Sequence, residues 1–254
     1  MVRGQIGRGQ EKEYPGRQTQ GTLPALLLLG LGEQIRARHV QTETSRDAQD
    51  ITITGAPKVL TQGVNAAGVV AQAITGGGGV MAVSGASGAV FSGSVYLGGT
   101  GGGTSGNAAV SMTLSGGSIQ TGGSFAPGLV AQVISGGGGL SAINATSVNL
   151  GGTVASKSNT LTVTNGAAIT TTGAASPGLV AQSIGGGGGL ALAATGASVR
   201  VGNKASGADG SNITITSIGQ IYTTGVNSFG ILAQSVGSGG GTVLTTGGTV
   251  SAAA

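Results

Sequence analysis

The sequence predicts an all-β protein whose chain winds through stacked coils, a right-handed parallel β-helix. Three observations support this prediction. Glycine accounts for 55 of 254 residues, charged residues for only 7% and aromatic residues for 2%. The apolar residues are mostly small or β-branched, which suits short strands joined by tight turns around a narrow core. From Ile51 onward the chain also repeats a long motif, and apolar and hydroxyl residues alternate between its copies.

The repeat is anchored on the dipeptide Ala-Gln, whose alanine stands at positions 71, 131, 181 and 233. The intervals between these positions are therefore 60, 50 and 52 residues. All four copies share one frame: Thr-x-Gly, four residues, Gly, two aliphatic residues, Ala-Gln, one residue, Ile or Val, and then a glycine-rich run. Self-similarity at a long period indicates a solenoid or an array.

Between the anchors, residues 112–116, 161–166 and 213–216 alternate apolar and hydroxyl side chains. A period of two predicts a strand with one face inward and one face in water. Helices are disfavoured here, because an interior glycine costs a helix about 1 kcal/mol. A stacked coil satisfies the backbone instead, since each strand pairs with the coils above and below it.

The expected size of a coil follows from shorter solenoid repeats, which need about 20 residues. Each repeat unit would then contain two or three coils. Residues 51–254 would form roughly ten coils, a rod near 50 Å long at about 4.8 Å per coil. Residues 243–250 resemble the start of a fifth unit with no polar cap after it, so we expect a fragment or a truncation of a longer array.

The composition divides the chain into a leader, residues 1–50, and the repeat region, residues 51–254. The leader contains seven of the eleven Lys and Arg residues, six of the seven Asp and Glu residues, and the only histidine, His39. An apolar run at residues 23–31 follows several basic residues, which is typical of a signal peptide. Glu11, Glu13 and the long basic region argue against that interpretation. The alternative is a poorly ordered leader with one short apolar helix.

The charges of the repeat region exclude several classes of function. It contains four basic residues and one acidic residue, namely Lys58, Lys157, Arg200, Lys204 and Asp209. Such a surface cannot neutralise a phosphate backbone, so we expect no nucleic-acid partner. The chain has no cysteine, which excludes disulfides and thiol chemistry.

The glycine runs do not fit a nucleotide-binding loop. No lysine follows them as in a phosphate-binding loop, and no helix with a later acid is expected as in a dinucleotide-binding fold. We predict tightly bent or protruding loops at these runs. Asp209 stands alone, whereas a calcium site needs six to eight oxygens and glycoside hydrolysis needs two carboxylates. The sequence therefore predicts no catalytic, metal or cofactor-binding residue, no cofactor and no enzyme.

The repeated glutamines Gln72, Gln132, Gln182 and Gln234 are the best polar candidates. They could line a binding stripe, or they could bond to the backbone at a corner of the coil. Coils of about 20 residues would separate the copies by two or three coils, so we expect no continuous ladder. The structural role is favoured, because buried amides need fixed partners and all four lie between aliphatic residues.

The block at residues 178–189, Gly-Leu-Val-Ala-Gln-Ser-Ile followed by five glycines, resembles the repeats of autotransporter passenger regions in Gram-negative bacteria. The resemblance covers about residues 51–250, with the third and fourth copies matching best. It implies a surface-exposed or secreted β-helical passenger with an adhesive role. Its partners would be host-surface or matrix components or neighbouring cells.

In that family a C-terminal outer-membrane β-barrel exports the passenger, and the sequence lacks the long alternating strands of such a barrel. The translocator is therefore expected in a full-length protein and is absent from this chain. The absence of cysteine agrees with passage through a pore, which the resemblance implies. Two alternatives stay open: a carbohydrate-active β-helix whose acids lie outside this fragment, and a glycine-rich remnant that does not fold.

Overall fold

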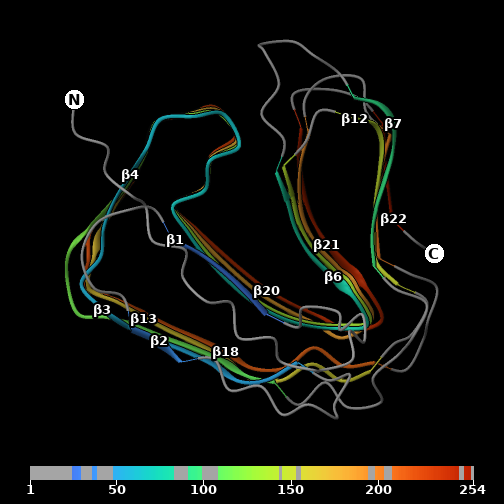
Figure 1. Ribbon diagram of the computed structural model, residues 1–254, viewed down its shortest axis with the longest axis horizontal. Coiled ribbons are helices and arrows are strands. Elements are labelled where there is room, and N and C mark those ends of the chain that lie inside the picture. Colours follow the sequence, from blue (N-terminus) through green and yellow to red (C-terminus); the bar gives the residue numbers. More distant parts are fainter. Residues whose placement is uncertain are drawn as a thin grey trace, which may run out of the picture.

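The computed structural model describes residues 25–29, 36–38, 48–82, 91–98, 108–142, 145–152, 156–193, 198–202, 208–245 and 249–252. All regular structure in these residues is β-strand, and the repeat region forms a parallel β-helix (Figure 1). The predicted fold class is thus confirmed. The predicted coil size was wrong, because each repeat unit forms a single rung of five strands, and the described chain builds four rungs.

The strands of each rung follow one another along the chain. The first rung consists of β3 (Ile51–Gly55), β4 (Lys58–Thr61), β5 (Val69–Thr75), β6 (Gly78–Ala82) and β7 (Phe91–Leu97). The second consists of β8 (Val110–Leu114), β9 (Ser118–Thr121), β10 (Leu129–Ser135), β11 (Gly138–Ala142) and β12 (Ala145–Leu150). The third consists of β13 (Leu161–Asn165), β14 (Ala168–Thr171), β15 (Leu179–Ile184), β16 (Gly188–Ala193) and β17 (Ser198–Val201). The fourth consists of β18 (Ile213–Ser217), β19 (Ile221–Thr223), β20 (Ile231–Val236), β21 (Gly240–Thr245) and β22 (Thr249–Ala252).

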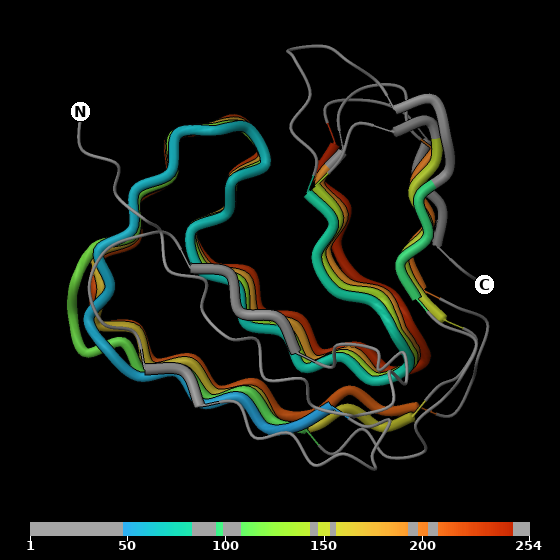
Figure 2. The backbone as a smooth tube through the Cα atoms, viewed as in Figure 1, coloured from blue at the N-terminus to red at the C-terminus, as the bar shows by residue number. Residues whose placement is uncertain are grey.

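Equivalent strands of successive rungs pair in parallel and build five sheets along the stack. Their register follows the repeat, since Ala131 pairs with Ala71 below it and with Ala181 above it. The rungs overlie one another when viewed down the stack (Figure 2). A slip of one residue would turn every side chain to the other face, so the buried pattern fixes this register. Four rungs at about 4.8 Å span roughly 14 Å from first to last, far shorter than the predicted rod.

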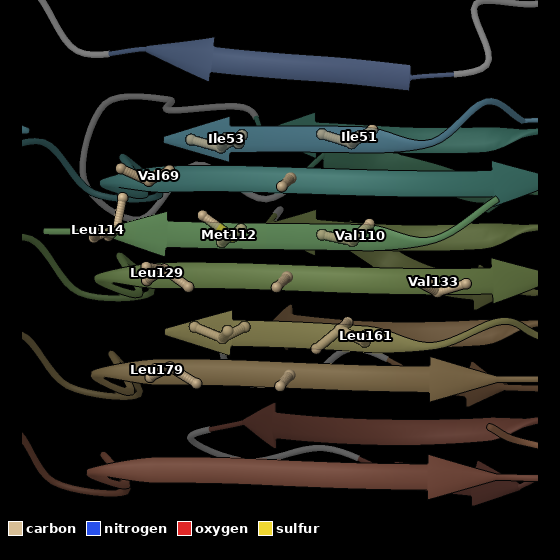
Figure 3. Packing of buried hydrophobic residues seen from close by; sticks show 14 of the residues in the cluster. Ile51, Ile53, Val69, Val110, Met112, Leu114, Leu129, Val133, Leu161 and Leu179 are labelled. Carbon is tan, nitrogen blue, oxygen red and sulfur yellow. The ribbon is translucent and has the colours of Figure 1, made fainter. Parts of the chain in front are cut away.

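Each rung outlines two lobes, one formed by β3, β4 and β5 and the other by β6 and β7 (Figure 2). The strands β5, β10 and β15 are buried along their whole length. In this sheet Val69, Leu129 and Leu179 belong to the core of the first lobe (Figure 3), together with Met112 of β8. Their neighbours Val70, Val130 and Val180 belong to a second cluster with Leu140 and Leu190 of the β6 sheet. Burial on both faces explains why the motif is nearly continuously apolar here.

The glycine runs form the corner between β5 and β6 in every rung. Gly138 has φ +128°, and a Cβ at this position would collide with the carbonyl oxygen of Gly188 in the next rung. Residues 136–139 and 185–189 are buried. The prediction of tight bends is confirmed, whereas the prediction of protruding loops was wrong, because these corners stack backbone on backbone.

In the first three rungs, the threonine that opens the motif closes the turn before β5, β10 or β15. The hydroxyl of Thr61 donates to the carbonyl of Ala66 at 2.7 Å, and Thr121 donates to Ala126 at 2.6 Å. Thr171 makes the same bond to the carbonyl of Ser176 at 2.5 Å. The invariant spacing in the sequence therefore has a local structural cause.

Two strands of the leader lie on the first rung. β1 (Ala25–Leu29) pairs antiparallel with β5, and β2 (Arg36–Arg38) pairs antiparallel with β3. The short helix expected in the apolar run was wrong at Ala25–Leu29, since the edge of β5 offers unpaired backbone groups to an extended segment. His39 and the basic residues before the apolar run lie outside the described residues, and nothing in the described part tests the signal-peptide interpretation or the predicted poor order. No helix in the described residues is long and apolar enough to cross a membrane.

Candidate functional site

The four repeated glutamines lie in register and form a ladder through the molecule. Gln72 Nε2 donates to Gln132 Oε1, Gln132 Nε2 to Gln182 Oε1 at 2.6 Å, and Gln182 Nε2 to Gln234 Oε1 at 2.8 Å. The expectation that these residues could not form a ladder was wrong, because one repeat makes one rung and brings each copy directly above the last.

The ladder lies between the sheet of β5 and the sheet of β6. Gln182 Nε2 also contacts the carbonyl oxygen of Gly189 at 3.3 Å, and Gln234 Nε2 makes the same contact with Gly241. Glycine at these positions has no side chain to occupy the space next to the amide. The exposed fraction is 1% for Gln72 and 0% for Gln132 and Gln182. Gln182 and Gln234 therefore connect the two sheets. The buried amides of Gln72, Gln132 and Gln182 cannot contact an external partner.

A second polar feature lies on the outer surface of the sheet formed by β3, β8, β13 and β18. The residues between the buried positions of these strands all carry hydroxyl groups and are exposed or half-buried. The strand register aligns them in two rows. We call this surface the hydroxyl face; it consists of Thr52, Ser111, Thr162 and Thr214 in one row and Thr54, Thr113, Thr164 and Thr216 in the other.

The geometry of the hydroxyl face follows from the strands. Neighbouring residues in a row are about 4.8 Å apart, and the two rows are roughly 6.7 Å apart along the strands. Seven of the eight residues are threonine, whose branched side chain has few χ1 rotamers. These eight residues thus form a regular array of hydroxyl and methyl groups and carry no charge themselves. At the edge of the sheet, β2 pairs Arg36 with Thr54 and Arg38 with Thr52.

The outer surface of the β7 sheet is different in kind. Its register aligns Tyr96, Asn149 and Arg200, which combine an aromatic ring, an amide and a charge in one row. Tyr96 is 72% exposed. Chemical uniformity is therefore a property of the hydroxyl face and not of every strand that faces solvent.

The described acids do not form a catalytic pair. Asp209 is exposed just before β18 of the fourth rung, whereas Asp50 precedes β3 of the first rung. Asp50 accepts a hydrogen bond from the backbone N–H of Ala109 at 2.7 Å, which is a structural use. Three rungs, roughly 14 Å, separate the two positions, against about 5 to 9.5 Å between the carboxyl groups of glycosidases. The described residues contain no group of three or more His, Cys, Asp or Glu side chains that could hold a metal ion.

The basic residues of the repeat region do not gather into one patch where they are described. Three of them are exposed at separate places: Lys58 on β4 of the first rung, Lys157 in the connection that leads into β13, and Arg200 on β17 of the third rung. Lys204 lies outside the described residues.

The sequence indicated the strands of the hydroxyl face but not the face itself. Alternation over residues 112–116, 161–166 and 213–216 predicted wet and buried sides correctly, as Met112 and Val163 show by their complete burial. The rows form because strands 51 to 59 residues apart pair side by side. The predicted coil of about 20 residues would not bring these strands together, so the rows could not be predicted from it.

Comparison with known proteins adds no relative: no family model, curated protein or solved structure matches the chain.

Proposed function

We propose that this chain is a structural and adhesive segment of a secreted or cell-surface protein, a β-helical passenger of the autotransporter type, without catalytic activity. The observation that supports this proposal is the hydroxyl face, an uncharged array carried by a rigid stack of strands. The resemblance of residues 178–189 to passenger repeats supplies the cellular setting.

Adhesion through such a face is physically reasonable because each contact is weak and many act together. A surface hydroxyl exchanges a bond to water for a bond to a partner, and the net gain per bond is small. Eight hydroxyls held on paired strands lose little conformational freedom on binding, and rigid presentation lowers the cost of association. Linked contacts to a polymeric partner then add by avidity.

The partners proposed are host-surface or matrix components or neighbouring cells, all of which present extended hydroxyl-rich or amide-rich polymers. A carbohydrate-cleaving role receives no support from the described acids, since Asp50 and Asp209 are separated by three rungs. The eight residues of the hydroxyl face carry no charge of their own that would direct binding to nucleic acid.

The test is retention of beads coated with the purified full chain on three surfaces: an extracellular-matrix protein, an uncharged polysaccharide and bare glass. We expect retention on at least one of the coated surfaces above that on glass. The variant Thr162→Lys, with its charge in the middle of the face, should reduce retention severalfold, because a desolvated unpaired charge opposes contact.

The matched control is Ala168→Lys, which adds the same charge to the same rung at an exposed position of β14. It should leave retention near that of the unchanged chain. Absence of retention on both coated surfaces, or equal losses from the two variants, would contradict the proposal.

A further inference from the structure

The hydroxyl face is flat and repeats in two directions. The rungs overlie one another down the stack (Figure 2), so the sheet of β3, β8, β13 and β18 has little of the twist that is usual in sheets. Its outward side chains lie about 4.8 Å apart along the stack and roughly 6.7 Å apart along each strand. Within the described residues no side-chain hydrogen bond uses these eight hydroxyl groups, whereas Thr121 and Thr171 donate inward. The outward hydroxyls are therefore held in a fixed array and stay available to water.

The spacing of this array is close to that of the water molecules in ice. In hexagonal ice each oxygen has four neighbours at about 2.75 Å in tetrahedral directions. Two oxygens joined through a third are then about 4.5 Å apart, and the repeat along the six-fold axis, eight thirds of the bond, is about 7.3 Å. The face differs from these distances by about 0.3 Å per rung and about 0.6 Å between the rows, which the spread of about 0.5 Å in each O–H···O distance can take up. A single water can thus bridge adjacent hydroxyls of one row in the arrangement that it has in ice.

Threonine also suits such a surface by its chemistry. Its hydroxyl donates and accepts hydrogen bonds, as a water molecule does. Its methyl group makes no hydrogen bond and restricts the orientations of the waters beside it. Its branched Cβ leaves few χ1 rotamers, so the array is largely formed before binding.

Charge is confined to the edge of this surface in the described residues. An ammonium or guanidinium group keeps a hydration shell of its own, which interrupts an ordered layer of water. The eight residues of the hydroxyl face carry no such group. Arg36 and Arg38 lie on β2, the edge strand beside β3, so the rows on β8, β13 and β18 lie away from them.

From this geometry we propose that the hydroxyl face binds the surface of ice crystals. The hydroxyls bond to waters of the crystal face, and the methyl groups lie over the spaces between those waters. Each contact is weak, but the rungs engage the crystal together, so the bound chain leaves slowly. The inference uses the same face as the proposed adhesion but does not depend on adhesion, because the ligand is solid water and not a polymer.

Binding of this kind has a consequence that adhesion to a polymer lacks. Ice between two bound chains can advance only as a curved front, and a curved front freezes at a lower temperature than a flat one. The crystal therefore stops growing just below its melting point, although the melting point itself is not lowered.

The experiment is observation of a single ice crystal in a solution of the full chain while the temperature is lowered slowly. We expect faceted crystals and a gap between the melting point and the temperature at which growth resumes, a gap that widens with protein concentration. Thr162→Lys should reduce this gap severalfold, because the hydrated ammonium group holds the face away from the crystal. Thr113→Lys, on the neighbouring rung, should do the same, and it provides the decision if circular dichroism shows that Thr162→Lys has lost its strands.

Ala168→Lys is the matched control, since it adds the same charge to the third rung at an exposed position of β14. It should leave the gap unchanged. The proposal is overturned if the unchanged chain shows no gap, if folded face variants keep the full gap, or if Ala168→Lys reduces it equally. Retention of coated beads without a gap would overturn ice binding and leave the adhesive function standing, whereas a gap without retention would support ice binding and contradict adhesion.

Discussion

Replacing Gln132 by leucine is the substitution whose effect can be worked out most completely. Gln132 is fully buried, accepts from Gln72 and donates to Gln182 at 2.6 Å. Leucine leaves Gln72 Nε2 and Gln182 Oε1 without these partners, and each such buried group costs about 1–3 kcal/mol. Removing the amide of Gln132 from the interior recovers roughly 1–2 kcal/mol. The midpoints of these ranges give an expected net loss in the free energy of unfolding of about 2.5 kcal/mol.

Urea unfolding of the full chain, followed by circular dichroism, measures this loss. Gln120→Leu is the matched control, because Gln120 is exposed on β9 of the same rung and should change stability by less than about 0.5 kcal/mol. Equal stability of the two variants would refute the reasoning, since it would mean that the ladder bonds add nothing to the stack.

Two further substitutions test the corners of the rungs by the same unfolding measurement. Gly138→Ala should cost about 3 kcal/mol or more, because φ is +128° and the new Cβ meets the Gly188 carbonyl, whereas Gly116→Ala, with open space around its Cβ, should be nearly neutral. Thr171→Val should cost about 1–2 kcal/mol through loss of the 2.5 Å bond to Ser176, and the outward-facing Thr162→Val should not. If Gly138→Ala left the free energy of unfolding unchanged, the glycine corner would tolerate a Cβ. If Thr171→Val and Thr162→Val lowered it equally, the Thr171 hydrogen bond would not stabilise its turn.

The sequence was sufficient for the fold class because two periods are visible in it. Alternation at Met112 and Val163 predicts half-buried strands, and the four Ala-Gln copies predict stacked units. The coil size was not predictable from those periods. In the strand after Gly128, every residue from Leu129 to Ser135 is buried, because one face packs in the first lobe and the other against the β6 sheet. Nothing in the sequence shows that a rung folds into two lobes, and a single-lobed coil would need far fewer residues.

The sequence analysis identified the repeated glutamines but missed their ladder, for the same reason. Gln72 and Gln132 are 60 residues apart, and they touch only if 60 residues make one turn of the chain. The rows of the hydroxyl face depend on the same alignment. The wrong prediction at Ala25–Leu29 has a different reason. A short apolar run fits a buried helix or a strand equally well. Only its pairing with the open edge of β5 makes it a strand here.

The central claim is that one repeat equals one rung, and cross-linking of cysteine pairs tests it most directly. The chain has no cysteine of its own, and Thr162 and Thr214 face outward in register on β13 and β18. Adjacent rungs place their Cα atoms about 4.8 Å apart, within the range of a disulfide, whereas Ser111 and Thr214 are two rungs and roughly 9.6 Å apart. We predict that Thr162→Cys with Thr214→Cys forms a disulfide within one chain under mild oxidation and that Ser111→Cys with Thr214→Cys does not. Absence of the first disulfide, or equal yield from both pairs, would contradict the four-rung stack.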